Sequence, residues 1–285
     1  MTLSVALPNK GALAEDATAI FREAGYRLRN DARELSFFDS QNDVEFFYLR
    51  PRDIATYVSA SQIDIGVTGR DLLIDSAKGA IERLALDFGH SEFRLAASAS
   101  ALNNGDVSEN NLQGKRIATA YPGLVRDFLS DKGISAEIVA LDGAVEGAIK
   151  LGVADLIVDV VATGNTIKQA GLKIFGPTIL ASEAILVTRP EFQSAALDVL
   201  IRRVSGVVIA RKYVLVDYDI EKKTLEQACA ITPGLESPTV SPLQKEDWVA
   251  VRAMVKRNEV HGVMDKLWEI GARGILVTDI HSCRL

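Results

Sequence analysis

The sequence reads Gly152-Val-Ala-Asp-Leu-Ile-Val-Asp159-Val-Val-Ala-Thr163-Gly164-Asn165-Thr166 where a buried strand ends at an acid and a small polar loop leads into a helix. Backbone N–H groups at such a helix start favour an anion. We therefore expect a phosphate-binding loop formed by Ala162, Thr163, Gly164, Asn165 and Thr166. Asp159 could then accept hydrogen bonds from the vicinal hydroxyls of a sugar. An ordinary strand-to-helix turn with a threonine cap is the alternative.

Around this stretch, short β-branched runs alternate with helical patterns, which is typical of an α/β protein. We predict strands at 3–7, 44–49, 63–67, 95–99, 116–119, 136–141 and 156–161, and helices at 11–24, 52–59, 69–76, 124–132 and 143–151. Thr68-Gly69 and Thr163-Gly164 each follow an acid and three mostly apolar residues. This repeat suggests two lobes that face one cleft, although so short a match could arise by chance.

After residue 211 the pattern changes to βαββαβ, the order of a small ferredoxin-like unit. The predicted strands are 213–216, 238–240, 248–254 and 274–278, and the predicted helices are 221–230 and 258–270. The loop from Ile231 to Thr239 is rich in Pro and Gly, and ordered loops of this kind often contact ligands.

Composition excludes several classes of protein. The chain has 285 residues, with 32 Lys and Arg against 38 Asp and Glu and a net charge of −6, so no basic surface for nucleic acid is expected. Its two cysteines, Cys229 and Cys283, form no disulfide framework or metal cluster. The N-terminus lacks the pattern of a signal peptide, and no apolar run reaches the roughly 18 residues of a membrane span. We expect a cytoplasmic protein without membrane contact.

Cations at two strand ends are candidates for binding phosphate oxygens. Lys10 and Gly11 follow the first strand, where a compact positive charge would suit a pyrophosphate or triphosphate. Arg50 and Arg52 flank Pro51 after another strand and could form an oxyanion clamp. Solvated surface positions are the alternative for all of these cations.

Three further residues could line a cleft. Asp71, in the first turn of a helix, could approach a metal or a polyphosphate, or could serve only the helix dipole. Tyr121 could stack on a base or fill the end of a strand. Glu146 could face the cleft or interact with its own helix start.

His90, His261 and His281 are isolated, and no nucleophile–base pair is evident. Chemistry based on positioning and charge neutralisation is therefore favoured.

The spacing of Glu146, Gly152, Ala154, Ile157, Asp159 and Thr163-Gly164-Asn165-Thr166 resembles the signature of the ATP phosphoribosyltransferases, which begin histidine biosynthesis. Ile167 departs from the family's usual Leu or Met, and Asn165 stands where many members carry Arg or Thr. The resemblance extends over the chain, and it includes Leu7–Leu13, Phe47–Ile54, Gly66–Leu72, Arg116–Pro122 and Ile231–Val240.

The resemblance implies a two-lobe catalytic region like a type II periplasmic binding protein, followed by a ferredoxin-like regulatory domain, as in the long form of the family. Expected boundaries are 1–92 with 183–211 for the first lobe, 93–182 for the second and 212–285 for the regulatory domain. The implied reaction transfers phosphoribosyl from phosphoribosyl pyrophosphate to N1 of ATP. Mg²⁺ would neutralise the pyrophosphate, mainly through substrate phosphates, with Asp71 as a candidate ligand.

The resemblance also assigns site residues. Asp159 and residues 162–166 would bind phosphoribosyl pyrophosphate, and the ATP or pyrophosphate side would comprise Lys10, Gly11, Arg50, Asp71, Tyr121 and Glu146. L-Histidine would inhibit by binding to Asp219, Leu235, Ser237, Thr239 and Gly274, and the protein would form dimers and hexamers. A non-catalytic ligand sensor and a phosphoribosyltransferase for another base are the rival interpretations.

Overall fold

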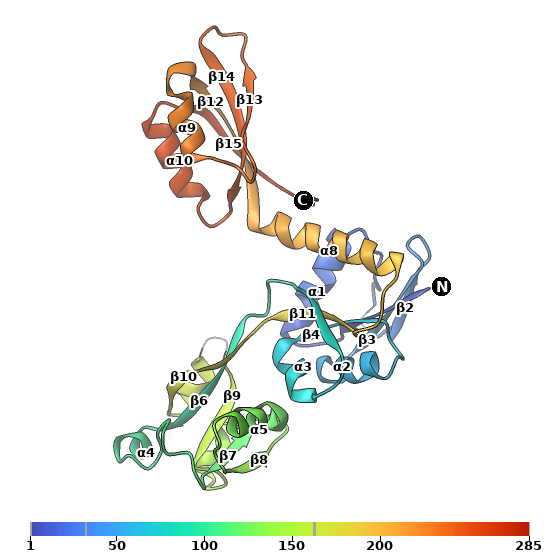
Figure 1. The fold of residues 1–285 in the computed structure, drawn as a ribbon, viewed down its shortest axis with the longest axis vertical. Helices are drawn as coiled ribbons and strands as arrows, with labels where there is room; N and C mark the ends of the chain where they lie inside the picture. Colours follow the sequence, from blue (N-terminus) through green and yellow to red (C-terminus); the bar gives the residue numbers. More distant parts are fainter. Residues whose placement is uncertain (1, 32, 162–163, 285) are drawn as a thin grey trace. The chain divides into compact units, whose positions relative to one another are not determined.

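The computed structural model describes residues 2–31, 33–161 and 164–284 (Figure 1). The chain forms two compact units, one made of residues 1–19 and 27–194 and the other of residues 20–26 and 195–285. Within the described ranges, every helix is too short or too polar to cross a membrane.

The first unit contains one sheet with the strand order β2-β3-β1-β4-β11-β5. Its strands are β1 (Leu3–Pro8), β2 (Ser36–Asp39), β3 (Val44–Leu49), β4 (Ile65–Gly69), β5 (Ile81–Ala85) and β11 (Ala184–Thr188). The helices that follow β1, β3 and β4 are α1 (Ala12–Glu23), α2 (Pro51–Ser59) and α3 (Arg70–Ser76). Because β3, β1 and β4 are parallel, their carboxyl ends lie at one edge of the sheet.

The packing of α2 on this sheet explains one glycine. A Cβ at Gly66 in β4 would lie 2.2 Å from Cγ2 of Ile54, which is fully buried. Val58, on the same helix face, is fully buried as well. The absence of a side chain at Gly66 lets the helix approach the sheet closely, and this close packing fixes where α2 begins.

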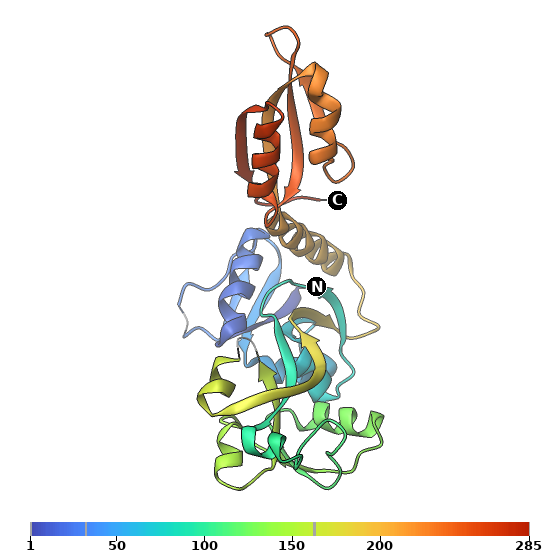
Figure 2. The ribbon, with the colours of Figure 1, turned by 90° about the vertical axis from the view of Figure 1, so that its left-hand side faces the viewer.

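The second sheet of this unit has the order β10-β6-β9-β7-β8. Its strands are β6 (Ser91–Ser98), β7 (Arg116–Thr119), β8 (Glu137–Ala140), β9 (Leu156–Val161) and β10 (Leu172–Ser182), and its helices are α4 (Ala99–Asn103), α5 (Pro122–Asp131), α6 (Gly147–Lys150) and α7 (Asn165–Gln169). The long antiparallel strands β6 and β10 run side by side on one side of the second sheet and carry the chain to and from the first (Figure 2). The chain thus enters the second lobe along β6 and leaves it along β10.

The second unit contains an antiparallel sheet with the order β13-β14-β12-β15. It comprises β12 (Tyr213–Glu221), β13 (Thr239–Pro242), β14 (Trp248–Lys256) and β15 (Arg273–Asp279), with α8 (Ala195–Lys212), the 3₁₀ turn η1 (Lys222–Thr224), α9 (Leu225–Ile231) and α10 (Val260–Glu269). Alternate residues of β12, from Val214 to Ile220, form the core with residues of α9 and α10. The hydroxyl groups of Tyr218 and Thr232 lie 2.7 Å apart and satisfy each other inside this core.

The architecture is the expected α/β class, with a two-lobe region like a type II periplasmic binding protein and a C-terminal ferredoxin-like domain. The exact domain boundaries stay a prediction. One predicted helix is wrong in length: residues 143–151 form only the short α6, because Gly143 and Ala144 adopt left-handed backbone conformations with φ of +96° and +49°. The helix predicted from 221 begins as η1 and becomes regular only at Leu225.

Candidate functional site

The predicted phosphate-binding loop connects β9 to α7. Gly164 precedes the first residue of α7 with φ of +74°, a conformation that favours glycine, and Asn165 and Thr166 begin the helix as exposed residues. Ala162 and Thr163, the other two predicted members, lie outside the described residues. The described part of the loop therefore presents the start of a helix beside the end of a strand, the arrangement on which the phosphate prediction depends.

A hollow of about 290 Å³ opens beside this loop. Its lining includes two carboxylates and two of the described loop residues but not Asn165, and it comprises Glu146, Asp159, Val160, Val161, Gly164, Thr166 and Ile167. The structure therefore brings Glu146 and Asp159 to the same cavity as Gly164 and Thr166. A carboxylate and a helix start that share one small cavity can bind different parts of a phosphorylated sugar.

Asp159 has an unusual electrostatic environment. Burial raises its pKa to about 6, against the influence of a hydrogen bond from the N–H of Val160, while the charges of Glu146 and Asp71 raise it and that of Arg52 lowers it. Asp71 and Arg52 belong to the first lobe, and Glu146 and Asp159 to the second. Predicted site residues from both lobes thus lie close enough to affect one another's charge.

Asp71, at the start of α3, lies close to the end of β10 and to the second lobe. Its carboxylate is 7% exposed, and its Oδ1 accepts a 2.8 Å hydrogen bond from Oγ of Ser182, which in turn accepts from the Asp71 N–H at 3.0 Å. The Tyr121 hydroxyl lies close to Asp71, and burial, followed by the charge of Asp71, raises the pKa of Tyr121 above its ordinary value. Tyr121 is therefore a neutral donor at physiological pH.

Arg52 packs over Tyr121 and joins the lobes. Its guanidinium carbon lies 4.9 Å from the ring centroid of Tyr121, Nη2 donates to the carbonyl of Ala120 at 2.9 Å, and Nη1 forms a 2.8 Å ion pair with Asp75. The Tyr121 ring meets Phe93 edge to face, with centroids 5.4 Å apart. These contacts hold the Tyr121 ring in place near Asp71.

The residues predicted at the first-lobe turns are exposed. Lys10 and Gly11 follow β1, and Arg50 precedes α2 in an extended conformation with Pro51 at the first helical position. Gly11 has φ of +82°. Since β1, β3 and β4 are parallel, the turns that carry Lys10, Arg50 and Asp71 lie at the same edge of the sheet. This edge therefore carries two cations and the acid that approaches the other lobe.

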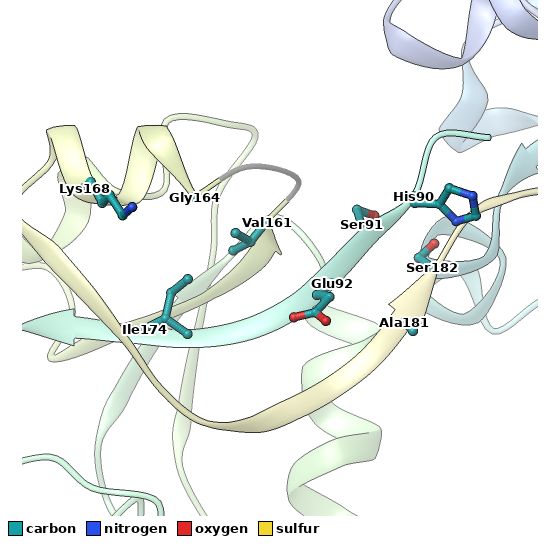
Figure 3. A pocket seen from close by; sticks show the side chains of 9 residues that line it. All are labelled: His90, Ser91, Glu92, Val161, Gly164, Lys168, Ile174, Ala181 and Ser182. Atoms are coloured by element: carbon teal, nitrogen blue, oxygen red, sulfur yellow. The ribbon is translucent and has the colours of Figure 1, made fainter. Parts of the chain in front are cut away.

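A second cavity, of about 530 Å³, lies along the strands that link the lobes (Figure 3). It extends from Gly164 and Lys168 to Ser182, and it is lined by His90, Ser91, Glu92, Val161, Gly164, Lys168, Ile174, Ala181 and Ser182. Figure 3 shows Glu92 on β6, with its carboxylate between the two linking strands, and His90 and Ser182 at the end of the cavity away from Lys168. The cavity therefore connects the predicted phosphate-binding loop with the serine that contacts Asp71.

The acids of the site suit a magnesium ion better than a softer metal. Mg²⁺ prefers oxygen ligands and is usually held by one or two carboxylates together with substrate phosphates. Asp71, Glu146 and Asp159 offer carboxylate oxygens, so these residues fit that role. A different group, Asp87, His90 and Glu183, has ligand atoms within 4.8 Å of one another, but its imidazole makes it a poor match for Mg²⁺.

Ser182 and Asp75 are site residues that sequence reasoning missed. Ser182 contacts Asp71 across 111 positions of sequence, and Asp75 contacts Gly123 across 48 positions. Neither residue stands in a motif, and each acquires its role only when the two lobes come together. No pattern of neighbouring residues could have identified them.

The residues expected to bind histidine lie in the second unit. Asp219 in β12 faces β15, where a Cβ at Gly274 would lie 3.5 Å from Oδ2 of Asp219. Gly274 has φ of +59°. Leu235, Ser237 and Thr239 are exposed members of one segment that leads into β13. The structure therefore groups Asp219 with Gly274, and the other three residues with one another.

Known proteins similar to this chain agree on one family. The family model described as ATP phosphoribosyltransferase matches residues 50–206, and the model of the family's C-terminal domain matches residues 210–282. An ATP phosphoribosyltransferase of Arthrobacter sp. (strain FB24) is 55% identical over 99% of this chain and 100% of its own, and that of Streptomyces coelicolor is 51% identical with the same coverage.

Among solved structures, a chain of the ATP phosphoribosyl transferase (HisG:HisZ) complex from Thermotoga maritima is similar to this one. It has a TM-score of 0.61 and 28% identity, and the match covers 73% of this chain and 98% of that chain. With matches to both the catalytic and the C-terminal family models, the chain belongs to the ATP phosphoribosyltransferase family, in its long form, and is an enzyme of the glycosyltransferase type.

Proposed function

We propose that this enzyme transfers the phosphoribosyl group of phosphoribosyl pyrophosphate to N1 of the adenine of ATP, with release of pyrophosphate, as the first step of L-histidine biosynthesis. The observation that carries the proposal is the cavity shared by Asp159, Glu146, Gly164 and Thr166, close to Asp71 of the other lobe. It offers separate groups for a sugar, for its phosphate and for a second substrate.

The sugar site follows from the chemistry of its residues. Asp159, when ionised, accepts hydrogen bonds from the ribose hydroxyls, and the turn at residues 162–166 binds the 5′-phosphate through backbone N–H groups. The anomeric carbon becomes cationic as the bond to pyrophosphate breaks, so a fixed carboxylate nearby favours that transition state. This reaction needs no protein nucleophile, in keeping with the positioning chemistry that the sequence favours.

The leaving group and ATP require positive charge. Lys10 and Arg50, at the sheet edge that carries Asp71, would neutralise the pyrophosphate or the triphosphate, and Tyr121 would border the purine. Asp71, Glu146 and Asp159 are the residues that would hold Mg²⁺ together with substrate phosphates. The ion would supply Lewis-acid stabilisation of the departing pyrophosphate.

The test is release of pyrophosphate from phosphoribosyl pyrophosphate with ATP, with adenine and with neither. We expect release with ATP and Mg²⁺ alone, together with an N1-linked product. Release with adenine in place of ATP would indicate a phosphoribosyltransferase for another base. Tight binding of a small molecule without any release would support a non-catalytic sensor.

We further propose that L-histidine inhibits the enzyme by binding to Asp219, Leu235, Ser237, Thr239 and Gly274. The carboxylate of Asp219 suits the ammonium or imidazole group, and the polar segment from Leu235 to Thr239 offers backbone and hydroxyl groups for the rest of the amino acid. Removal of residues 212–285 should abolish the inhibition. Inhibition that survives in a folded truncated protein would place the histidine site elsewhere.

Assembly and location complete the proposal. Dimers and hexamers would differ in their affinity for histidine, because a ligand shifts an equilibrium only by such a difference. Sedimentation with and without histidine tests this point, and an unchanged distribution would contradict it.

We place the enzyme in the cytoplasm, where a reducing environment suits the free thiols of Cys229 and Cys283.

A further inference from the structure

We propose that Ser182 is a positioning residue of the reaction: from the linking strand β10, its hydroxyl fixes the carboxylate of Asp71 in the orientation that meets Tyr121 of the other lobe. The inference rests on the proposed function in one respect, namely that Asp71 borders the substrate cleft. It adds a residue that lies outside the motifs of the family signature and outside the two first-lobe turns.

The contact between Ser182 and Asp71 is reciprocal and buried. Oγ of Ser182 donates to Oδ1 of Asp71 at 2.8 Å and accepts from the Asp71 N–H at 3.0 Å. Ser182 is 5% exposed and Asp71 is 7% exposed. A hydroxyl that binds both the backbone and the side chain of one residue leaves that side chain little rotational freedom, and hydrogen bonds to charged groups in buried positions are strong.

The backbone beside Asp71 supports the same orientation. A Cβ at Gly69 would lie only 2.3 Å from Oδ1 of Asp71, so the carboxylate occupies space that any side chain at position 69 would take. Asp71 therefore folds back toward the start of α3 and toward Ser182. The hydroxyl of Ser182 holds the carboxylate there, and the absence of a side chain at Gly69 leaves room for it.

Arg70, the neighbour of Asp71, binds both residues that flank Ser182. The N–H of Arg70 donates to the carbonyl of Glu183 at 3.0 Å, and its guanidinium pairs with the Glu183 carboxylate at 3.2 Å. A further contact of 3.5 Å joins Nη1 of Arg70 to the carbonyl of Ala181. The start of α3 thus holds three consecutive residues at the end of β10, and this register sets the Ser182 hydroxyl opposite Asp71.

On its other side, Asp71 meets the second lobe. Together with burial, the charge of Asp71 raises the pKa of Tyr121, so the carboxylate lies between the Ser182 hydroxyl of the linking strand and the Tyr121 phenol of the other lobe. Ser182 also lines the 530 Å³ cavity that reaches Gly164 (Figure 3). Loss of the serine hydroxyl would free the carboxylate to rotate and would weaken its alignment with Tyr121 and with bound substrate.

A double-mutant cycle separates positioning from simple packing. The four proteins are wild type, Ser182→Ala, Asp71→Asn and the double variant, with kcat and KM measured for both substrates. We expect Ser182→Ala to lower kcat/KM about 10- to 100-fold, as for the loss of a hydrogen bond to a buried charge. In the Asp71→Asn background the same change should alter kcat/KM less than about twofold.

Two more variants make the test specific. Ser182→Thr retains a hydroxyl and should recover most of the lost activity. Thr178→Ala, which removes an exposed hydroxyl from the same strand, should leave kcat/KM within about twofold of wild type. Equal losses from Ser182→Ala in both backgrounds, or no loss in either, would overturn the inference.

Failure of the proposed function would look different. In that case the wild-type protein would form no N1-linked product from phosphoribosyl pyrophosphate and ATP. The same four proteins would then be compared by urea unfolding. If Ser182 holds Asp71, the effect of the double substitution on the unfolding equilibrium constant should differ about tenfold from the product of the two single effects. Strict additivity in that measurement would show that Ser182 does not hold Asp71.

Discussion

The backbone N–H of Gly123 donates a 2.8 Å hydrogen bond to Oδ1 of Asp75, and this bond joins the start of α5 in one lobe to α3 in the other. The N–H of Leu124 donates to the same oxygen at 3.2 Å, and Arg52 pairs with the second oxygen. Asp75 thus satisfies N–H groups at the start of a helix that belongs to the opposite lobe. The contact holds the lobes together at the point where Tyr121 reaches Asp71.

Gly123→Ala should separate the lobes at this contact. A Cβ at position 123 would lie 2.2 Å from the backbone carbonyl oxygen of Asp75, so α3 and α5 would have to move apart. We expect a loss of about 1–3 kcal/mol in unfolding free energy and a marked fall in kcat. Urea unfolding and steady-state kinetics measure both effects.

Gly79→Ala is the matched control, because among the described residues, apart from the glycine's own chain neighbours, no heavy atom lies within 4 Å of the position that a Cβ would take. It should change the unfolding free energy by less than about 0.5 kcal/mol. Similar effects from the two substitutions would argue against a close approach of the lobes at Gly123.

Asp159→Asn should weaken phosphoribosyl pyrophosphate binding far more than ATP binding. The amide retains the size of the side chain but offers only one acceptor oxygen and no charge to the ribose hydroxyls. Calorimetric titration with each substrate checks this difference. Equal losses for the two substrates would remove Asp159 from the sugar site.

The pH dependence of stability should change in the same variant. In the folded protein the pKa of Asp159 rises from 3.8 to about 6, mainly through burial. Between these values the unfolded chain ionises while the folded protein keeps its proton, so wild-type stability falls as pH rises through this window. At pH 7 the Asn variant should therefore be more stable than wild type, by about 2 kcal/mol.

Unfolding measured at pH 4 and at pH 7 tests this expectation. The difference between the two proteins should be small at pH 4 and should favour the variant at pH 7. A constant difference would mean that Asp159 ionises as it does in an unfolded chain.

Tyr121→Phe should reduce activity without unfolding the protein. The ring still meets Phe93 and Arg52, but the hydroxyl that lies close to Asp71 is lost. We expect kcat/KM to fall about tenfold and the melting temperature to stay nearly unchanged. Because burial raises the pKa of Tyr121, the wild-type rate should show no alkaline decline from this phenol below about pH 10.

Asp219→Asn should weaken histidine inhibition at least about tenfold while kcat without histidine stays the same, because the variant loses the charge that attracts a cationic group. Asp265→Asn, an exposed position on α10, is the control and should be inhibited like wild type. If both variants kept normal inhibition, histidine would have to bind without Asp219.

Much of the fold follows from local patterns. The apolar run that ends at Asp159 and the βαββαβ order after residue 211 predict strands that the structure contains, because burial of alternating or continuous apolar residues depends on neighbours in sequence. The helix predicted over residues 143–151 is an exception. Left-handed turns at Gly143 and Ala144 interrupt an otherwise helical pattern, and periodicity does not report backbone conformation.

Only part of the candidate site was predictable from the sequence, because some of its contacts join residues that are distant in sequence. Asp71, Tyr121, Glu146 and Asp159 stand at ends of strands or starts of helices, where α/β proteins place their ligands. Ser182 and Asp75 act through partners that are distant in sequence and that meet them only in the folded molecule. Lys10 and Arg50 lie at the expected sheet edge, and their contacts with substrate stay a prediction.

A crystal structure of the enzyme with phosphoribosyl pyrophosphate tests the central claim most directly. It should show the 5′-phosphate against the backbone N–H groups that follow Asp159, with both ribose hydroxyls bonded to that carboxylate. A phosphorylated sugar bound elsewhere, with the turn between Val161 and Thr166 empty, would contradict the account.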